Sequence, residues 1–220
     1  MSARRRNLEE LRTYFEGRWR TAPDTPWGDI SACTIEHTKA RLLRPHISGA
    51  RAILDLGCGG GDFLGMVVPD HAFERVVGVD VASAAIARAR LTGLYTELQT
   101  AAIETITGLV AGRFDFILLG EMLYYVPDPI AALATALDGF LADEGYVAIT
   151  LAAGRSYFAE RDIAGLREVL STRGLAPLLD TRIEYFWAGA PRRYYGWAFA
   201  QTHKVVLVYA RRAMSPATRR

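Results

Sequence analysis

A short apolar segment that leads straight into a glycine-rich turn constrains the fold of this chain more than any other feature. Residues 52–56 are apolar apart from Asp55, and Gly57 and Gly59–Gly61 follow directly. Residues 63–68 then have the apolar spacing of a helix. A buried strand, a glycine turn and a helix in this order are typical of nucleotide-binding α/β folds.

Short apolar segments alternate with helical patterns along the rest of the chain, which predicts a doubly wound α/β domain: a parallel sheet with helices on both faces. The second helix is expected to end near Pro45, and Ser83 is a candidate N-cap for a later one. The expected strands are 52–56, 75–80, a weaker 96–100, 114–119, 145–151, 182–187 and 203–209, and the expected helices are 8–19, 35–43, 63–68, 83–91, 129–141 and 162–173.

The length and composition fit one globular domain with a continuous core. Of the 220 residues, 50% are hydrophobic and 23% are charged, and the net charge of +2 provides no strong attraction to nucleic acid or membranes. Basic residues cluster near both ends, where we interpret them as solvated tails rather than nucleic-acid contacts. We expect an N-terminal helical lid (1–48), a core (49–212) with an aromatic insertion near 185–200, and a tail (213–220).

The chain has two cysteines, Cys33 and Cys58, and no Cys-x-x-Cys pattern. This argues against a disulfide framework and against structural zinc, so we expect no metal site. No apolar run approaches the ~20 residues that a membrane-spanning helix needs. The arginine-rich start leads into Leu8–Leu11, which is not the apolar core of a signal peptide. We therefore expect a cytoplasmic protein.

The spacing of the glycines separates the cofactor loops that share this arrangement. A phosphate-binding loop needs Gly-Lys-Ser/Thr, which does not follow here. A dinucleotide loop needs Gly-x-Gly-x-x-Gly, but counting from Gly57 and Gly59 the third position holds Asp62. An acid, Asp55, instead precedes the glycines. A carboxylate suits the ammonium group of S-adenosylmethionine (SAM), and bare backbone lets this cofactor lie close, so the loop favours SAM.

A second acid strengthens this interpretation. Asp80 ends the second expected strand, 23 positions after Gly57. A carboxylate there can accept hydrogen bonds from both ribose hydroxyls of the cofactor. The alternative is that Asp80 only caps the helix that follows. The loop, the strand and the acid at this spacing together favour the cofactor role.

Three segments resemble those of the class I SAM-dependent methyltransferases: Ile53–Gly61, Val77–Asp80 and Phe114–Tyr125. The match covers about residues 27–151. It implies a Rossmann-like, mostly parallel seven-stranded sheet with the last strand antiparallel, behind an N-terminal helical lid. It also implies that SAM binds a set of residues near the strand ends: Trp27, Asp55, Gly57, Cys58, Gly59, Asp80, Val81, Ala102, Ile103 and Gly120.

One position departs from the family pattern. The third strand of these enzymes usually ends in an acid that accepts the adenine amino group, whereas this chain has Ala102 there. The resemblance leaves two possibilities. Either the backbone at Ala102 and Ile103 holds the adenine, or Glu104 substitutes for the missing acid.

The resemblance also places the end of the fourth strand beside the sulfonium of the cofactor. Strand ends of open α/β sheets face the ligand crevice on physical grounds alone. Methyl transfer is an in-line displacement that needs alignment and exclusion of water, with an acceptor that is uncharged at nitrogen or deprotonated at oxygen. The candidate catalytic residues, as proton acceptors or orienting groups, are Glu121, Tyr125 and His37. His203 is a weaker candidate, because it starts an expected strand.

The two neighbouring tyrosines have two interpretations. Tyr124 or Tyr125 can pack in the core, and we expect this of one of them. The other can offer a π face or an oxygen to the sulfonium.

A narrower resemblance, to the nodulation-type (NodS-like) N-methyltransferases, rests on Asp24–Trp27, Glu36–Lys39 and Glu121–Tyr125. That family methylates an amine on an amino-sugar oligomer. The resemblance implies that Trp27 covers the cofactor or the acceptor. The alternative is that Trp27 pins the lid to the core.

The aromatic segments Tyr185–Trp187 and Arg192–Phe199 have no counterpart in that family. They can build an acceptor pocket, in which Arg192 or Arg193 binds an anionic group. They can equally form a dimer interface, because exposed aromatic residues favour that use.

Taken together, the resemblance implies a SAM-dependent methyltransferase acting on a small-molecule acceptor, with an amine or amino-sugar nitrogen favoured. The alternatives are O-methylation in a natural-product pathway and a SAM-binding protein without catalysis, and the intact Asp55 and Asp80 argue against the latter. Asp62 disfavours a nicotinamide oxidoreductase. We expect a monomer or homodimer that binds neither nucleic acid nor membranes.

Overall fold

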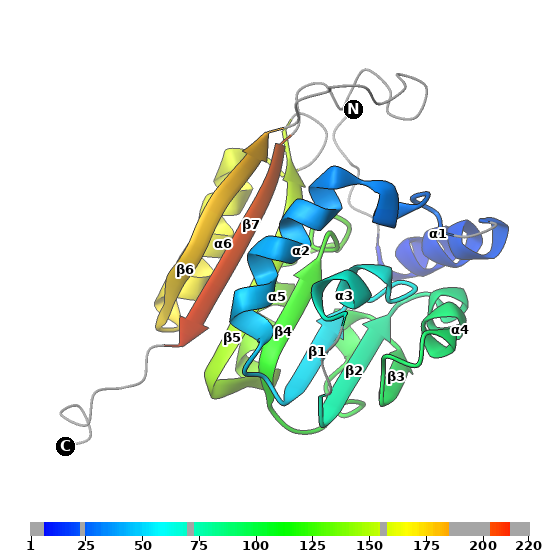
Figure 1. Ribbon diagram of the computed structural model, residues 1–220, viewed down its shortest axis with the longest axis horizontal. Helices are drawn as coiled ribbons and strands as arrows, with labels where there is room; N and C mark the ends of the chain where they lie inside the picture. Colours follow the sequence, from blue (N-terminus) through cyan, green and yellow to red (C-terminus); the bar gives the residue numbers. More distant parts are fainter. Residues whose placement is uncertain (1–6, 23–24, 70–72, 155–157, 185–202, 212–220) are drawn as a thin grey trace.

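The computed structural model describes residues 7–22, 25–69, 73–154, 158–184 and 203–211. These residues form one seven-stranded sheet in the order β3-β2-β1-β4-β5-β7-β6, covered by helices on both faces (Figure 1). The strands are β1 (Ala52–Leu56), β2 (Arg75–Asp80), β3 (Glu97–Thr100), β4 (Phe114–Gly120), β5 (Leu141–Ala153), β6 (Leu175–Glu184) and β7 (His203–Arg211).

The helices alternate with the strands along the chain. They are α1 (Leu8–Thr21), α2 (Thr34–Ile47), α3 (Asp62–Val67), α4 (Ser83–Leu91), α5 (Pro129–Phe140) and α6 (Glu160–Thr172), with short 3₁₀ turns at Ile30–Ala32 and Ile103–Thr105. No helix in the described ranges is long and apolar enough to cross a membrane.

The direction of the strands confirms the predicted fold class. β1 pairs in parallel with β2 and β4, and the parallel pairing continues to β3 on one side and to β5 on the other. β7 is antiparallel to both of its neighbours, β5 and β6. The chain order reverses between β1 and β4, and open α/β sheets bind ligands beyond the carboxyl ends of the strands at such a point.

Residues alternate between two cores along each strand, because successive side chains point to opposite faces of a sheet. In β4, Ile117 and Leu119 pack on the side of α5 and α6, whereas Phe116 and Leu118 pack on the side of α2 and α3. Figure 1 shows α2 and α3 in front of the sheet and α5 and α6 behind it.

α2 is longer than expected. The helix continues through Pro45 to Ile47, although proline cannot donate the hydrogen bond that would close this turn. Ala40, Leu43 and Ile47 are fully buried against the sheet, and this packing offsets the missing bond. The expectation of a helix end near Pro45 was therefore wrong.

α1 is tied to α4 by a glutamate. The carboxylate of Glu16 accepts hydrogen bonds from the Ser83 hydroxyl (2.9 Å) and from the Ala84 backbone N–H (3.2 Å). Ser83 is the first helical residue and Ala82 occupies the N-cap position, so the expectation that Ser83 caps the helix was wrong. Glu16 fills that role from a distant part of the chain, because the free N–H groups at a helix start can donate to any nearby oxygen.

The bounds of two predicted strands were also wrong, since β5 (Leu141–Ala153) extends beyond the predicted 145–151 at both ends and β6 differs more. β6 starts at Leu175 and ends at Glu184, whereas the sequence pattern placed a strand at 182–187. The beginning of β6 was not predicted because Pro177 indicates a break in a strand. Proline is tolerated on an edge strand such as this one, where the pairing with β7 shifts between Pro177 and Leu179. Residues 185–202, with the aromatic insertion, lie outside the described residues, and the domain boundaries at 48 and 212 stay predictions.

Gly78 provides a test of the packing below the glycine turn. A Cβ atom at this position would lie 2.7 Å from the Tyr95 ring and 2.8 Å from Leu98 Cδ2. We expect Gly78→Ala to lower the free energy of unfolding by about 1–3 kcal/mol, because the extra methyl forces this packing apart. Urea unfolding measures the change.

Gly139, near the end of α5, is the matched control because nothing lies within 4 Å of its Cβ position. Gly139→Ala should leave stability unchanged or raise it by up to about 1 kcal/mol, because alanine favours helix. Equal losses in the two variants would contradict the packing argument.

Candidate functional site

The carboxyl ends of β1 to β4 meet at one edge of the sheet, and the predicted cofactor residues follow these strand ends. The glycine loop (57–61) follows β1, Asp80 ends β2, and Gly120 ends β4. Ala102 and Ile103, both buried, come just after β3. Residues from four separate segments therefore share one edge of the sheet, as parallel strands require.

The glycine loop is held by its backbone. The N–H groups of Gly57 and Cys58 donate to the Val79 carbonyl at 2.8 and 3.0 Å. Gly57, Gly59 and Gly61 have φ angles of 73°, 56° and 90°, a region that side chains disfavour. The positions of the glycines therefore follow from the shape of the turn, which leaves bare backbone at the edge of the sheet.

Asp80 joins the ends of β1 and β2. Its Oδ2 accepts a hydrogen bond from Gly59 N–H and its Oδ1 accepts one from Ala82 N–H, both at 2.9 Å. Burial raises the pKa of Asp80, although the backbone hydrogen bonds act in the opposite direction. Because one oxygen binds the loop, Asp80 does more than cap the next helix.

Asp55 lies beneath the loop. It is 3% exposed, and the Tyr95 hydroxyl donates to its Oδ2 at 2.7 Å. Burial raises the pKa of Asp55 to about 7, against the lowering effect of this hydrogen bond. Tyr95 was not predicted from the sequence, and its ring fills the space left open by Gly61 and Gly78. The absence of side chains at these two glycines was the signal that a bulky group lies nearby.

Trp19 of α1 covers the other side of the glycine loop. A Cβ atom on Gly59 would lie 3.0 Å from Trp19 Cζ2, and one on Gly60 would lie 3.4 Å from Trp19 Cη2. Trp19 is 4% exposed and also packs against α4. The sequence predicted a helix over this segment, but no sequence signal placed Trp19 on the loop.

Glu121 has an unusual backbone conformation at the end of β4. Its φ angle is +54°, and its N–H donates to the Thr150 carbonyl at 2.8 Å. Non-glycine residues rarely adopt this conformation, and they do so most often at functional sites. The conformation turns the chain sharply out of the strand.

The side chain of Glu121 is held between two lysines. Lys39 Nζ of α2 lies 2.7 Å from Oε1, and Lys204 Nζ of β7 lies 2.5 Å from Oε2. The Tyr124 hydroxyl also donates to Oε2, at 2.9 Å. Lys39 is fully buried and forms a second ion pair with Glu36 at 2.7 Å. We call these four charged residues (Glu36, Lys39, Glu121 and Lys204) the ion cluster.

The ion cluster determines what Glu121 can do. Burial alone would raise the pKa of Glu121, but the nearby ammonium groups of Lys204 and Lys39 outweigh burial and hold it well below its usual range. A carboxylate with such a low proton affinity accepts a proton poorly. Of the two roles predicted for Glu121, this favours an orienting group over a proton acceptor.

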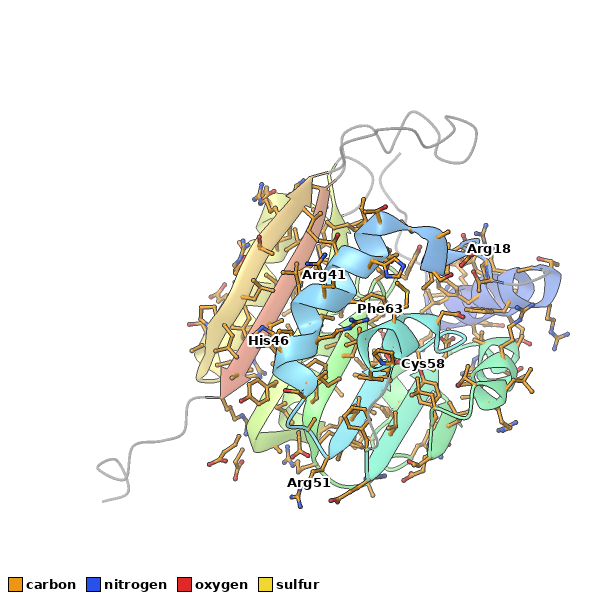
Figure 2. The ribbon with its side chains drawn as sticks, viewed as in Figure 1. Arg18, Arg41, His46, Arg51, Cys58 and Phe63 are labelled. Carbon is orange, nitrogen blue, oxygen red and sulfur yellow. The ribbon has the colours of Figure 1, made fainter. Side chains whose placement is uncertain are left out.

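The ion cluster lies between α2 and the sheet. Lys39 Nζ lies 4.9 Å from the centre of the Phe63 ring, which places a cation over an aromatic face. Figure 2 shows Phe63, from the first turn of α3, beside α2, with Cys58 of the glycine loop nearby. The ion cluster and the glycine loop are therefore neighbours across α3.

Aromatic side chains gather beside Glu121. The ring centre of Tyr125 lies 4.5 Å from that of Tyr124, 4.9 Å from that of Phe15 and 6.2 Å from that of Trp27, with which it is stacked. The guanidinium of Arg18 lies 4.9 Å from the centre of the Trp27 ring. We call Phe15, Trp27, Tyr124 and Tyr125 the aromatic cluster. It joins the N-terminal segment to the end of β4.

The structure brings Glu121, Tyr125 and Trp27 together but leaves His37 apart. His37 is exposed on α2, and its Nε2 donates to the Ser31 carbonyl at 2.6 Å. Within the described ranges it makes no hydrogen bond to Glu121 or Tyr125. His203 lies at the start of β7 with its Nε2 3.6 Å from Glu160, in keeping with a strand-end position. The catalytic role of His37 stays a prediction.

Three comparisons place these features among known proteins. A model of the methyltransferase domain matches residues 30–203. A ubiquinone biosynthesis O-methyltransferase of Xanthomonas oryzae pv. oryzae is 33% identical over 122 residues, which is 53% of this chain and 48% of that protein. The chain thus spans about half the length of the curated relatives it matches.

Solved structures share the fold. The N-methyltransferase NodS from Bradyrhizobium japonicum, in complex with S-adenosyl-L-homocysteine (SAH), aligns with a TM-score of 0.69 and 21% identity, covering 92% of this chain and 99% of NodS. The magnesium protoporphyrin IX methyltransferase from Synechocystis, with bound SAM, aligns with a TM-score of 0.65 and 17% identity, covering 96% of this chain and 100% of that chain. At these identities the likeness concerns the fold.

The ion cluster should be costly to break. We expect Lys39→Met to lower the free energy of unfolding by about 3–5 kcal/mol, because Glu36 and Glu121 then lose a buried countercharge. Arg173→Met removes the more exposed ion pair with Asp138 and should cost less than about 1 kcal/mol. Chemical denaturation of both variants measures the difference, and similar losses would argue against a stabilising ion cluster.

Asp55 should make stability depend on pH. Its pKa is about 7 in the folded chain and near 3.8 when unperturbed, so the folded state retains a proton that the unfolded state releases between these values. The free energy of unfolding should therefore fall as pH rises from about 4 to 7. Asp55→Asn cannot ionise, so its stability relative to the native chain should improve between pH 5 and pH 8.

Thermal unfolding at the two pH values measures this effect. Asp143→Asn is the control, because the Asp143 side chain is fully exposed. A constant difference between Asp55→Asn and the native chain would show that Asp55 does not titrate in this range.

Proposed function

The chain belongs to the methyltransferase domain family, and from this premise we propose that it is a SAM-dependent enzyme that moves a methyl group by in-line displacement to a small-molecule acceptor. The membership agrees with the class I pattern of the glycine loop and the Asp80 strand. One observation carries the proposal: Asp80, at the end of β2, binds the backbone of the glycine loop at the edge where the strand order reverses.

The residues at this edge fit SAM. The glycine loop presents backbone without side chains, with Met122 packed at Gly57 and Trp19 at Gly59, and the carboxylate of Asp80 can accept hydrogen bonds from the ribose hydroxyls. Asp55 supplies a second carboxyl group below the loop, where a cation would favour its ionised form. When bound, SAM supplies a methyl group on a positively charged sulfur.

We propose that further residues contact the cofactor. Val81 follows Asp80, and Cys58 lies within the glycine loop. Ala102 and Ile103 follow β3, so their backbone can hold the adenine in place of the missing acid, and Gly120 ends β4. Trp27 belongs to the aromatic cluster, which is placed to exclude water from the reacting atoms.

The remaining residues are assigned to the acceptor side. Tyr125 borders the departing methyl group, and Glu121 orients the end of β4. The ammonium groups of Lys39 and Lys204 are paired with the carboxylates of Glu36 and Glu121, so the ion cluster carries no net formal charge. The favoured acceptor is an amine or amino-sugar nitrogen, in line with the likeness to the N-methyltransferase NodS, and it must be neutral when it attacks. His37 stays a candidate proton acceptor, and its side chain would have to reach the acceptor from the exposed side of α2.

A second candidate is oxygen methylation of a phenol. The aromatic cluster offers ring faces for such an acceptor. The curated relative named above is itself an O-methyltransferase. The described part of the chain does not include Arg192 and Arg193, so their proposed contact with an anionic group rests on the sequence.

The location and partners also belong to this proposal. We propose that the protein is cytoplasmic, that it is a monomer or a homodimer, and that it binds neither nucleic acid nor membranes. These statements rest on the composition and charge of the chain.

Calorimetry and a methylation assay test the proposed function. The purified chain should bind SAM and not NAD. With radiolabelled SAM, a deacetylated chitin oligomer should gain label if nitrogen is the acceptor, and catechol should gain label if oxygen is. SAM binding without labelling of either compound would contradict both acceptor classes, and NAD binding without SAM binding would contradict the enzyme class.

Asp80 allows a sharper test of the cofactor site. Asp80→Ala should weaken SAM binding by roughly 10-fold or more, because a charged acceptor worth about 1.5–3 kcal/mol is lost. Asp80→Asn keeps one acceptor oxygen, so its SAM affinity should lie between those of the native chain and Asp80→Ala. Asp143→Ala, on a fully exposed side chain, is the control. Unchanged affinity in Asp80→Ala would remove Asp80 from the site.

A further inference from the structure

We propose that Lys39 and Lys204 are positioning residues that hold Tyr125 at the methyl-transfer edge, acting through Glu121 and Tyr124. The inference rests on the proposed function, because Tyr125 matters only if that edge receives the methyl group. It adds two residues to the site that the motif pattern did not mark as functional.

The first step is the anchoring of Glu121. Its carboxylate accepts hydrogen bonds from Lys39 at 2.7 Å and from Lys204 at 2.5 Å. Glu121 is therefore bound by both α2 and β7. Lys39 is fully buried, and the Lys204 side chain is 11% exposed. Buried ammonium groups are costly unless paired, so the positions of both are tightly coupled to that of Glu121.

The second step is the turn that follows Glu121. The positive φ of Glu121 takes the chain out of β4, and Tyr125 N–H donates to the Met122 carbonyl at 3.0 Å. A backbone conformation of this kind persists only where its surroundings hold it in place. The ion cluster supplies this restraint and thereby sets the starting point of the turn that carries both tyrosines.

The third step passes from Glu121 to Tyr125. The Tyr124 hydroxyl donates to Glu121 Oε2 at 2.9 Å, which fixes the position of the Tyr124 ring. That ring lies 4.5 Å from the ring of Tyr125, measured between centres. Any rotation of Tyr124 would therefore push against Tyr125.

The fourth step joins Tyr125 to the N-terminal segment. Its ring meets Phe15 edge-on at 4.9 Å and stacks with Trp27 at 6.2 Å. A continuous series of contacts thus runs from the buried lysines to the aromatic cluster. Because the alignment of reacting atoms is sensitive to small displacements, such a series controls turnover more than cofactor affinity.

A fluorine label on tryptophan tests this series of contacts without knowledge of the acceptor. The chain has four tryptophans, and incorporation of 5-fluorotryptophan gives each one its own ¹⁹F NMR signal. Trp27→Phe and Trp19→Phe assign the two signals of interest. Tyr125→Leu should shift the Trp27 signal, because it removes the stacked ring.

Lys204→Met and Tyr124→Phe should each shift the Trp27 signal while leaving the Trp19 signal in place. Lys204→Arg, which keeps the charge, should restore the native position. Arg173→Met, which removes an ion pair on the surface, is the control and should shift neither signal. SAM affinity of the Lys204, Tyr124 and Arg173 variants should stay within about threefold of native, since these three residues are not among those packed against the glycines of the loop.

Three outcomes decide the matter. The proposal is overturned if Tyr125→Leu shifts the Trp27 signal while both Lys204→Met and Tyr124→Phe leave it unchanged. If Lys204→Met also moves the Trp19 signal, the fold itself has changed, and Tyr124→Phe decides alone because it keeps all four charges. A chain that fails to bind SAM yet shows the expected shifts would refute the proposed function and not the contacts.

With an acceptor in hand, turnover gives a second readout. Lys204→Met should lower kcat about 10- to 100-fold with little change in SAM affinity, as expected when reacting groups are slightly misplaced. An equal loss of SAM affinity and kcat would instead point to general damage and would count against a positioning role.

Discussion

The pairing of Glu121 with two lysines is the interaction on which the end of β4, and with it the proposed acceptor side, depends. A carboxylate in a strained backbone conformation would not stay at the end of β4 unless something held it there, and Lys39 and Lys204 do so from α2 and β7. The same pairing fixes the N-terminal segment over the sheet, since Lys39 belongs to α2. One cluster of charges therefore sets both the conformation of the strand end and the position of the helix that covers it.

The cofactor side is built in a different way. Its shape comes from the backbone: three glycines with positive φ angles, two N–H groups donating to the Val79 carbonyl, and Asp80 joining the loop to β2. Side chains such as Tyr95 and Trp19 fill the space around the loop. A site made of backbone geometry tolerates changes elsewhere in the chain, because it needs only the local turn and the neighbouring strand.

This contrast explains how much could be predicted from sequence. The glycine loop, Asp80 and the parallel order follow from local spacing and strand alternation, and the structure has the predicted fold. The start of β6 was missed because Pro177 reads as a break, although an edge strand tolerates it. The ion cluster was missed because Lys39 and Lys204 lie 82 and 83 residues from Glu121 along the chain. Local patterns carry no information on such contacts, and a lysine in a helix usually indicates a solvated face.

The cofactor half and the proposed acceptor half of the site therefore have different physical requirements. The cofactor is constant in a methyl-transfer reaction, so a local backbone turn suffices and can be shared by proteins with different acceptors. The proposed acceptor half draws on α1, α2, the end of β4 and β7, so a change in any one of these segments would alter its shape. This agrees with the range of relatives, which includes an O-methyltransferase and an N-methyltransferase around one fold. Acceptor choice in this chain should accordingly be found in the contacts between those segments rather than in the glycine loop.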